Sequence, residues 1–152
     1  MTHSELAKNY FNSGYNCSQS VLLAFSDLTG LEEETAARLA SSFGGGLARM
    51  REVCGAVSGG AMVLGLLCGY SDPEDHAAKK AHYALVRDFA ERFRSANGSI
   101  ICRSLLAGTG ATDGGAPEQR TEEYYRKRPC AELCACAADI LDEIFTENHF
   151  YS

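Results

Sequence analysis

The chain has 152 residues, with 20 acidic and 14 basic side chains that give a formal net charge of −6. That length suits one domain with a real core, and a composition of 45% hydrophobic and 22% charged residues excludes wholesale disorder. The acidic balance provides no broad basic surface for DNA or anionic lipid, so we expect no nucleic-acid partner.

Helical periodicity dominates the first half of the chain. Apolar side chains recur at three- and four-residue steps over residues 4–12, and Ser4 can cap this helix. A second helix opens near Asn16 and ends before Gly30, and a third runs from three glutamates at 32–34 to a glycine triplet at 44–46. After a basic loop at 49–51, an apolar helix spans about 54–69. It is too short to cross a bilayer, so we expect a buried helix and no membrane insertion.

The second half follows the same pattern. Ser71 or Asp72 as cap, with Pro73 at the first helical position, predicts the longest helix, which ends near 97–98. A short helix at 100–106, a loop at 107–117 and a final helix from about 129 to 147 complete the chain, and we interpret the basic, aromatic stretch 124–128 as a surface lead-in. No alternating run of strand length appears. We therefore predict an all-α, single-domain bundle of five to seven helices over residues 1–152.

The cysteine count, seven, constrains the chemistry. The N-terminus lacks a basic segment followed by an apolar core, so we expect a cytoplasmic protein, in which thiols stay reduced unless they have a role. An odd number also argues against a static disulfide scaffold. The cysteines are therefore core packing, metal ligands or redox thiols.

Four cysteines share a position, because each falls in the first turn of a predicted helix. A helix N-terminus offers free N–H groups and a positive dipole end, which stabilise a thiolate. These candidate catalytic and metal-ligating residues are Cys17, Cys54, Cys102 and Cys130.

Residues around Cys54 extend this interpretation. Arg49 and Arg51 flank Cys54, which makes it the candidate nucleophile and leaves anion capture near the two arginines open. Gly55 removes a side chain beside the sulfur, and Gly59 allows a helix or a cofactor to approach closely. We treat both glycines as candidate cofactor-binding positions, although helix packing alone also explains their spacing.

The other cysteines lie outside this set. Cys68 sits in an apolar run, where we expect a buried small hydrophobic residue. On one helix Cys130 and Cys134 share a face, whereas Cys136 points about 200° away from Cys134. The chain has no C-x-x-C pair, so neither a zinc finger nor a thioredoxin-type dithiol is supported.

The ordered motifs resemble those of the redox-active proteins named for the pattern C…GCAxxG…C…C. The matching pieces are Gly14-Tyr15-Asn16-Cys17-Ser18-Gln19-Ser20-Val21, Phe43-Gly44-Gly45-Gly46, Cys54-Gly55-Ala56-Val57-Ser58-Gly59, Cys102 and Arg128-Pro129-Cys130. They extend over about residues 4–145. The central motif here has Cys before Gly, so its thiol is Cys54.

The resemblance implies redox chemistry at the four cysteines with an unknown redox partner, and an association with a transporter system. The centre is either a metal site, iron–sulfur or zinc, or a set of thiols that cycles through disulfides for electron transfer or redox sensing. The alternative is a helical binding or adaptor protein whose cysteines only pack the core. The glycines and apolar stretch near Cys54 also fit a homodimer.

Overall fold

The computed structural model describes residues 1–151, and the all-α prediction is confirmed, because that range contains helices and no β-strand. The elements, in chain order, are α1 (His3–Asn12), α2 (Cys17–Ala24), α3 (Ser26–Thr29), α4 (Glu33–Ala40), the 3₁₀-helix η1 (Ser41–Phe43), α5 (Gly55–Cys68), α6 (His76–Asn97), α7 (Cys102–Leu105), α8 (Glu122–Lys127) and α9 (Cys130–Glu147).

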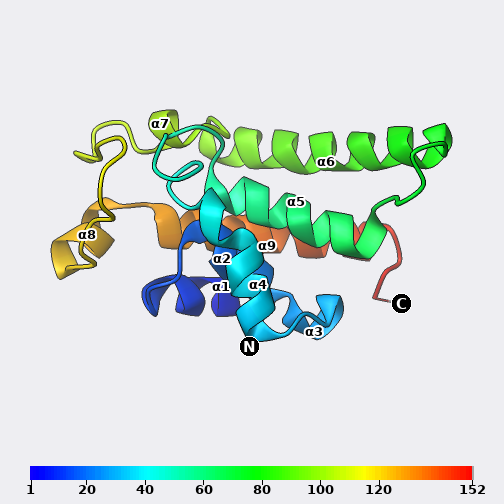
Figure 1. Ribbon diagram of the computed structural model, residues 1–152, viewed down its shortest axis with the longest axis horizontal. Coiled ribbons are helices and arrows are strands. Elements are labelled where there is room, and N and C mark those ends of the chain that lie inside the picture. Colours follow the sequence, from blue (N-terminus) through cyan, green and yellow to red (C-terminus); the bar gives the residue numbers. More distant parts are fainter. Residues whose placement is uncertain (152) are drawn as a thin grey trace.

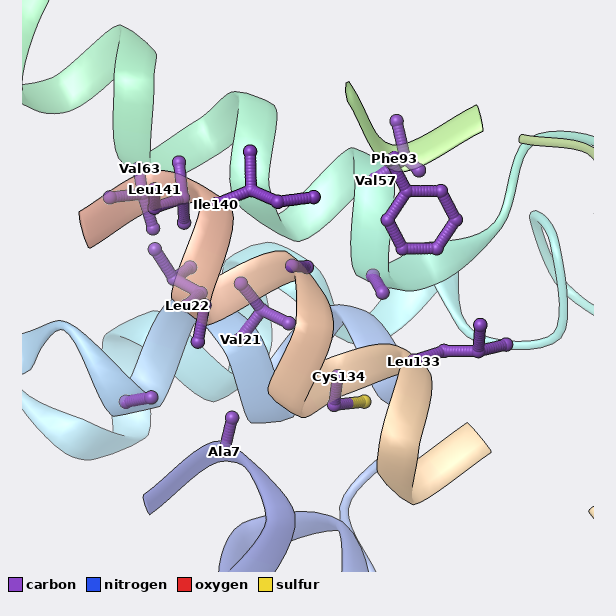
Figure 2. Packing of buried hydrophobic residues seen from close by; sticks show 14 of the residues in the cluster. Ala7, Val21, Leu22, Val57, Val63, Phe93, Leu133, Cys134, Ile140 and Leu141 are labelled. Carbon is purple, nitrogen blue, oxygen red and sulfur yellow. The ribbon is translucent and has the colours of Figure 1, made fainter. Parts of the chain in front are cut away.

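Helix α9 is the centre of the structure, and α1, α2, α5 and α6 all pack on it (Figure 1). Its inward residues Cys134, Ile140 and Leu141 meet Leu22 of α2 and Val63 of α5 in a continuous apolar core (Figure 2). Among residues 1–151, no helix is long and apolar enough to cross a membrane.

Two glycines of α5 allow its close packing against neighbouring helices. A Cβ at Gly59 would lie 2.6 Å from the carbonyl oxygen of Ser18 in α2, and a Cβ at Gly60 would lie 2.3 Å from the ring of Phe89 in α6. The glycines that suggested a homodimer therefore contact helices of their own chain, and the homodimer stays a prediction.

The helix count is higher than the predicted five to seven, for two local reasons. The predicted second helix breaks at Phe25, which separates the four-residue α3 from α2. The stretch interpreted as a surface lead-in is instead the helix α8, capped by the Thr121 side chain, which accepts a hydrogen bond from the Tyr124 N–H at 3.1 Å.

Two further expectations are wrong. Helix α6 begins at His76 rather than Pro73, because the Asp72 carboxylate closes a turn onto the Glu74 N–H and Asp75 caps the helix instead. Cys68 is exposed rather than buried, because the last turn of α5 extends beyond the core.

Candidate functional site

The four predicted cysteines line one cavity of about 360 Å³. Its lining residues come from the end of the bundle where α7, α8 and the irregular segment between them lie near the N-termini of α5 and α9 (Figure 1). Each cysteine stands at a helix start, as predicted: Cys17, Cys102 and Cys130 are the first residues of α2, α7 and α9, and Cys54 is the N-cap of α5. Four segments far apart in the sequence thus present their thiols to one space.

Local backbone bonds position these cysteines. Cys17 follows Asn16, whose side chain accepts from the Gln19 N–H at 2.9 Å while the Gln19 side chain accepts from the Asn16 N–H at 3.0 Å, a reciprocal cap that fixes the start of α2. Cys54 and Cys102 flank an isolated antiparallel bridge between Val53 and Ile101. The Cys54 N–H donates to Ile100 at 2.8 Å, and the Cys102 N–H donates to Glu52 at 2.6 Å.

One wall of the cavity is a left-handed turn. Five consecutive residues, from Gly45 to Arg49, have φ between 47° and 69°, and three of them are not glycine. Each non-glycine residue in this region costs roughly 1–2 kcal/mol, so contacts elsewhere must hold the turn. Gly46 is required here, because a Cβ would lie 2.7 Å from the Cβ of Cys102.

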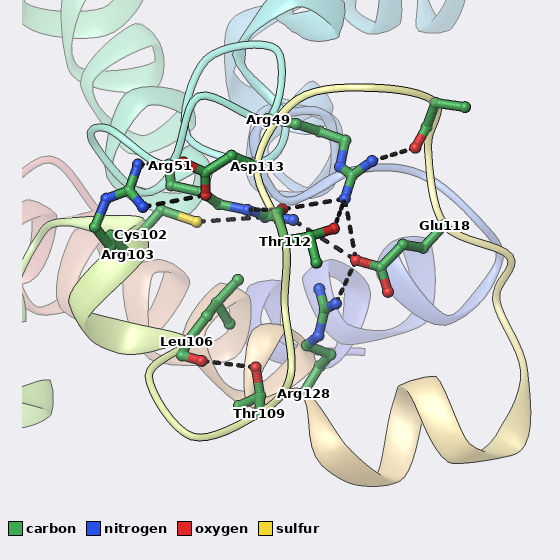
Figure 3. A network of polar contacts seen from close by, with 11 residues as sticks. Arg49, Arg51, Cys102, Arg103, Leu106, Thr109, Thr112, Asp113, Glu118 and Arg128 are labelled. Carbon is green, nitrogen blue, oxygen red and sulfur yellow. Dashed lines mark hydrogen bonds and ion pairs between the residues drawn. The ribbon is translucent and has the colours of Figure 1, made fainter.

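Four arginines and one acidic residue also line the cavity: Arg49, Arg51, Arg120, Arg128 and Glu118. Three of these arginines converge on the Glu118 carboxylate (Figure 3). Arg49 and Arg51 also donate to the Thr112 carbonyl, at 3.1 and 3.0 Å, and so fasten the segment 107–121 over the cavity. The Arg120 side chain donates to the carbonyls of Phe11 and Tyr15, both at 3.0 Å.

A third thiol contacts the Cys17–Cys130 pair. Interaction with the Cys130 thiol lowers the pKa of Cys17, but interaction with Cys134 and burial raise it, and the pKa lies well above its ordinary value. The pKa of Cys130 is raised, because its interaction with Cys17 and its burial both favour the neutral thiol. The Cys134 thiol also donates to the Cys17 carbonyl at 3.8 Å. Cys17 therefore lies between two thiols of α9.

The two arginines expected beside Cys54 are directed elsewhere. Burial raises the pKa of Cys54 to about 12, despite opposing hydrogen bonds from the Ala56 and Val57 backbone. Arg51 reaches Cys102 instead, with Nη1 at 3.6 Å from Sγ. Burial raises the pKa of Cys102, and the hydrogen bond from Arg51 opposes that rise. Burial thus opposes the effect of the helix N-terminus at Cys54, and its role as the nucleophile stays a prediction.

The two predicted glycines and Cys136 lie in different surroundings. Gly55 lines the cavity, and a Cβ there would lie 3.1 Å from the Cβ of Cys17. Gly59 does not line it and lies between α5 and α2. Cys136 faces α6, where its sulfur accepts from Asn97 at 3.5 Å, in agreement with its predicted direction away from Cys134.

Four soft sulfur donors with nearby cationic side chains suit an iron–sulfur cluster or zinc by chemistry. Their arrangement does not yet form such a site: within the described part of the chain, no three His, Cys, Asp or Glu side chains converge to hold a metal ion. Metal binding would have to draw the thiols closer together.

Comparison with known families agrees with the motifs. Residues 15–144 match the family described as "Putative redox-active protein (C_GCAxxG_C_C)". The chain belongs to this family. No curated protein and no solved structure matches it. The family description assigns its members to redox-active proteins and specifies neither a centre nor a reaction.

Several site residues were missed from the sequence. Cys134 could have been found, because it lies one turn after Cys130 on the same helical face. Arg120 lies between the predicted loop and the basic stretch and was given no role. Arg128 ends the stretch that we interpreted as a surface lead-in, but its side chain is only 5% exposed. Glu118 gave no local signal, since only tertiary structure brings it to the arginines.

Proposed function

We propose that the protein carries out reversible dithiol–disulfide exchange in this cavity, with Cys17 and Cys130 as the reacting pair. The observation that carries the proposal is that these two thiols, at the starts of α2 and α9, line one cavity large enough for a small molecule and lie near enough for each to shift the pKa of the other. Both are free thiols, as are the other five cysteines.

The reaction needs an external disulfide as oxidant and conserves atoms and electrons. In this proposal Cys17 is the attacking group, and it must first lose its proton, because its pKa lies well above the ordinary value even though Cys130 lowers it. Attack on one external sulfur releases the first small thiolate and leaves a mixed disulfide. Cys130 then attacks the Cys17 sulfur and releases the second small thiolate. The two protein protons pass to the two leaving groups, so a dithiol and a disulfide become a disulfide and two thiols.

A second candidate is a metal centre on Cys17, Cys54, Cys102 and Cys130. It is favoured by the single cavity that all four thiols line, beside four arginines that would offset the negative charge of a thiolate-bound cluster. An iron–sulfur cluster would supply one-electron transfer, whereas zinc would supply a structural or Lewis-acid site without redox change. In this second function the four cysteines would bind the metal and would form no disulfides with one another.

The test is an anaerobic preparation analysed for iron, sulfide, zinc and visible absorption, followed by stepwise oxidation with a small disulfide. For the dithiol, we expect two thiols to be lost together, and peptide mapping to recover Cys17 joined to Cys130. Replacement Cys17→Ser should abolish this pairing. Cys68→Ser, at an exposed position away from the cavity, is the matched control and should leave it intact.

Each other outcome identifies a different function. Stoichiometric iron and sulfide that are lost in Cys54→Ser would favour the iron–sulfur cluster over the dithiol as the function of the site. Seven inert thiols, with replacements that change only stability, would favour the adaptor function, with a transporter system as the expected partner. The dithiol proposal also assumes the cytoplasm, where small thiols can return the pair to its reduced form.

A further inference from the structure

The charge inside the cavity is opposite to that of the chain. The protein carries a net charge of −6, yet four arginines and a single acidic side chain line the cavity. Three of the arginines and the acidic side chain form one cluster: Arg49, Arg51, Arg128 and Glu118. Buried cations require compensating negative charge. Glu118 contacts all three arginines. The exposed Asp113, which pairs with Arg103, is a second carboxylate near Arg49 and Arg51, so the three arginines of the cluster and Arg103 share two carboxylates.

All three guanidinium groups share one oxygen of Glu118 (Figure 3). The distances from their Nη2 atoms to Oε1 are 2.6 Å for Arg128, 3.2 Å for Arg49 and 3.8 Å for Arg51. The arginines are fixed and buried, with Arg51 6% exposed, whereas the Glu118 side chain is 35% exposed. Glu118 also lies on the irregular segment 107–121 rather than on a helix. It is therefore the replaceable member of the cluster.

One guanidinium joins this cluster to a thiol. Arg51 places Nη2 at 3.8 Å from the Glu118 carboxylate and Nη1 at 3.6 Å from the Cys102 sulfur. An anion in the place of the carboxylate would therefore lie one guanidinium away from a cavity cysteine. Arg51 is held in that orientation by the bond from its Nε to the Thr112 carbonyl.

We propose that Arg49, Arg51 and Arg128 form a substrate anion site, in which the Glu118 carboxylate holds the place of the anionic group of a small disulfide. The ligand class is a low-molecular-weight disulfide that carries a carboxylate, sulfonate or phosphate group. This assignment of a substrate class rests on the proposed exchange function, although the anion site itself does not. Cationic and neutral disulfides cannot replace Glu118 without leaving buried arginines unpaired.

The anion site is tested first, without redox chemistry, by calorimetric titration with inorganic sulfate at constant ionic strength. Glu118→Gln removes the competing carboxylate, so we expect it to bind sulfate about tenfold more tightly than the wild type. Glu147→Gln is the matched control, because it removes a carboxylate from the remote Arg92 cluster and should leave sulfate affinity unchanged.

The contribution of the arginines is tested at Arg49 on the same background. Adding Arg49→Gln to Glu118→Gln should abolish the gain in affinity, and adding Arg49→Lys should retain part of it, since lysine keeps the charge but not the guanidinium. Thermal unfolding of each variant verifies that it is folded. Equal sulfate affinity in Glu118→Gln and the wild type, or a gain that survives Arg49→Gln, would overturn the anion site.

The substrate class is tested by the rate of thiol exchange with three disulfides of similar length: dithiodipropionate, hydroxyethyl disulfide and cystamine, which are anionic, neutral and cationic. After division by the rates with free cysteine, we expect the anionic compound to react about tenfold faster than the neutral one, and the cationic one to be slowest. Equal rates together with sulfate binding would overturn the substrate class alone. Sulfate binding without any cysteine pairing would instead overturn the proposed exchange function and leave the anion site.

Discussion

Burial, rather than position at a helix start, decides the protonation state of the cavity cysteines. Every thiol described at the site has a pKa above its ordinary value, including Cys54 at about 12. The dipole and free N–H groups of a helix N-terminus favour a thiolate, but loss of water costs a buried charge more. The resting site therefore holds neutral thiols, and the proposed exchange would begin with the deprotonation of one of them.

This protonation state predicts slow alkylation of Cys54. At pH 8 a thiol with a pKa of about 12 is ionised in only about one molecule in ten thousand, and the ionised fraction rises about tenfold per pH unit. Iodoacetamide treatment at pH 8, followed by peptide mass mapping, should label the exposed Cys68 first and Cys54 far more slowly. Cys54 labelled as fast as Cys68 would show that its thiolate is stabilised.

The position of Cys134 predicts an alternative disulfide. Cys134 lies one turn after Cys130 and contacts Cys17, so it can replace the lost thiol in Cys130→Ser. We expect oxidised Cys130→Ser to contain Cys17 joined to Cys134, formed more slowly because Cys134 does not line the cavity. Peptide mapping measures this, with Cys136→Ser as the control that keeps Cys17 joined to Cys130. If no disulfide between Cys17 and Cys134 is found, Cys134 does not lie close enough to Cys17 to replace Cys130.

At the scale of the elements, the left-handed turn before α5 is the least expected feature. The glycine triplet correctly predicted the end of the preceding helix. It could not predict that Leu47, Ala48 and Arg49 would continue the left-handed conformation, because bonds to the distant Thr112 and Gly114 help hold them there. The same limit applies to Glu118, whose three partners come from two other segments.

The strain in this turn predicts that replacement by glycine has opposite effects on stability at two exposed leucines. Leu47→Gly removes a side chain from the left-handed region and should stabilise the protein by about 1 kcal/mol. Leu39→Gly, within α4, should destabilise it by about 1 kcal/mol, since glycine weakens a helix interior. Urea unfolding measures both changes. Destabilisation by both variants would mean that the Leu47 side chain makes contacts worth more than the strain.

The packing of α2 on α5 predicts the effect of filling Gly59. Gly59→Ala places a methyl group 2.6 Å from the backbone carbonyl of Ser18, which cannot rotate away, so we expect a loss of about 1–3 kcal/mol. Gly65→Ala, in the same helix with open space around it, should gain about 0.5–1 kcal/mol. If Gly59→Ala unfolds normally but no longer reacts or binds a cofactor, the position is functional rather than structural.

At the scale of the whole molecule, the sequence predicted which thiols gather but not what surrounds them. Helix starts are local signals, and all four cysteines were placed correctly by them. The charge of the cavity is a tertiary property, because its arginines come from the turn before α5, the segment before α8 and the end of α8. An acidic chain with a cationic interior cannot be recognised from net charge.

This internal charge predicts an acid dependence of stability. The hydrogen bond from Arg128 holds the pKa of Glu118 below its ordinary value of 4.5, and nearby Arg49 and Arg51 lower it further. Its contribution is thus present above pH 4.5 and is lost as the pH falls through the lowered pKa. Between pH 7 and 3 we expect the free energy of unfolding to fall more steeply in the wild type than in Glu118→Gln. Parallel curves, measured by urea unfolding, would contradict this.

The distance along the chain between Cys17 and Cys130 links oxidation to mechanical and proteolytic resistance. A disulfide between them would close a loop of roughly a hundred residues and join the first helices to the last. By lowering the entropy of the unfolded chain, it would stabilise the folded protein by about 4–5 kcal/mol. By the same thermodynamic cycle, folding holds the two sulfurs together and makes the bond harder to reduce. The oxidised protein would then outlast the reduced one in a cell, so its abundance would itself record recent exposure to oxidant.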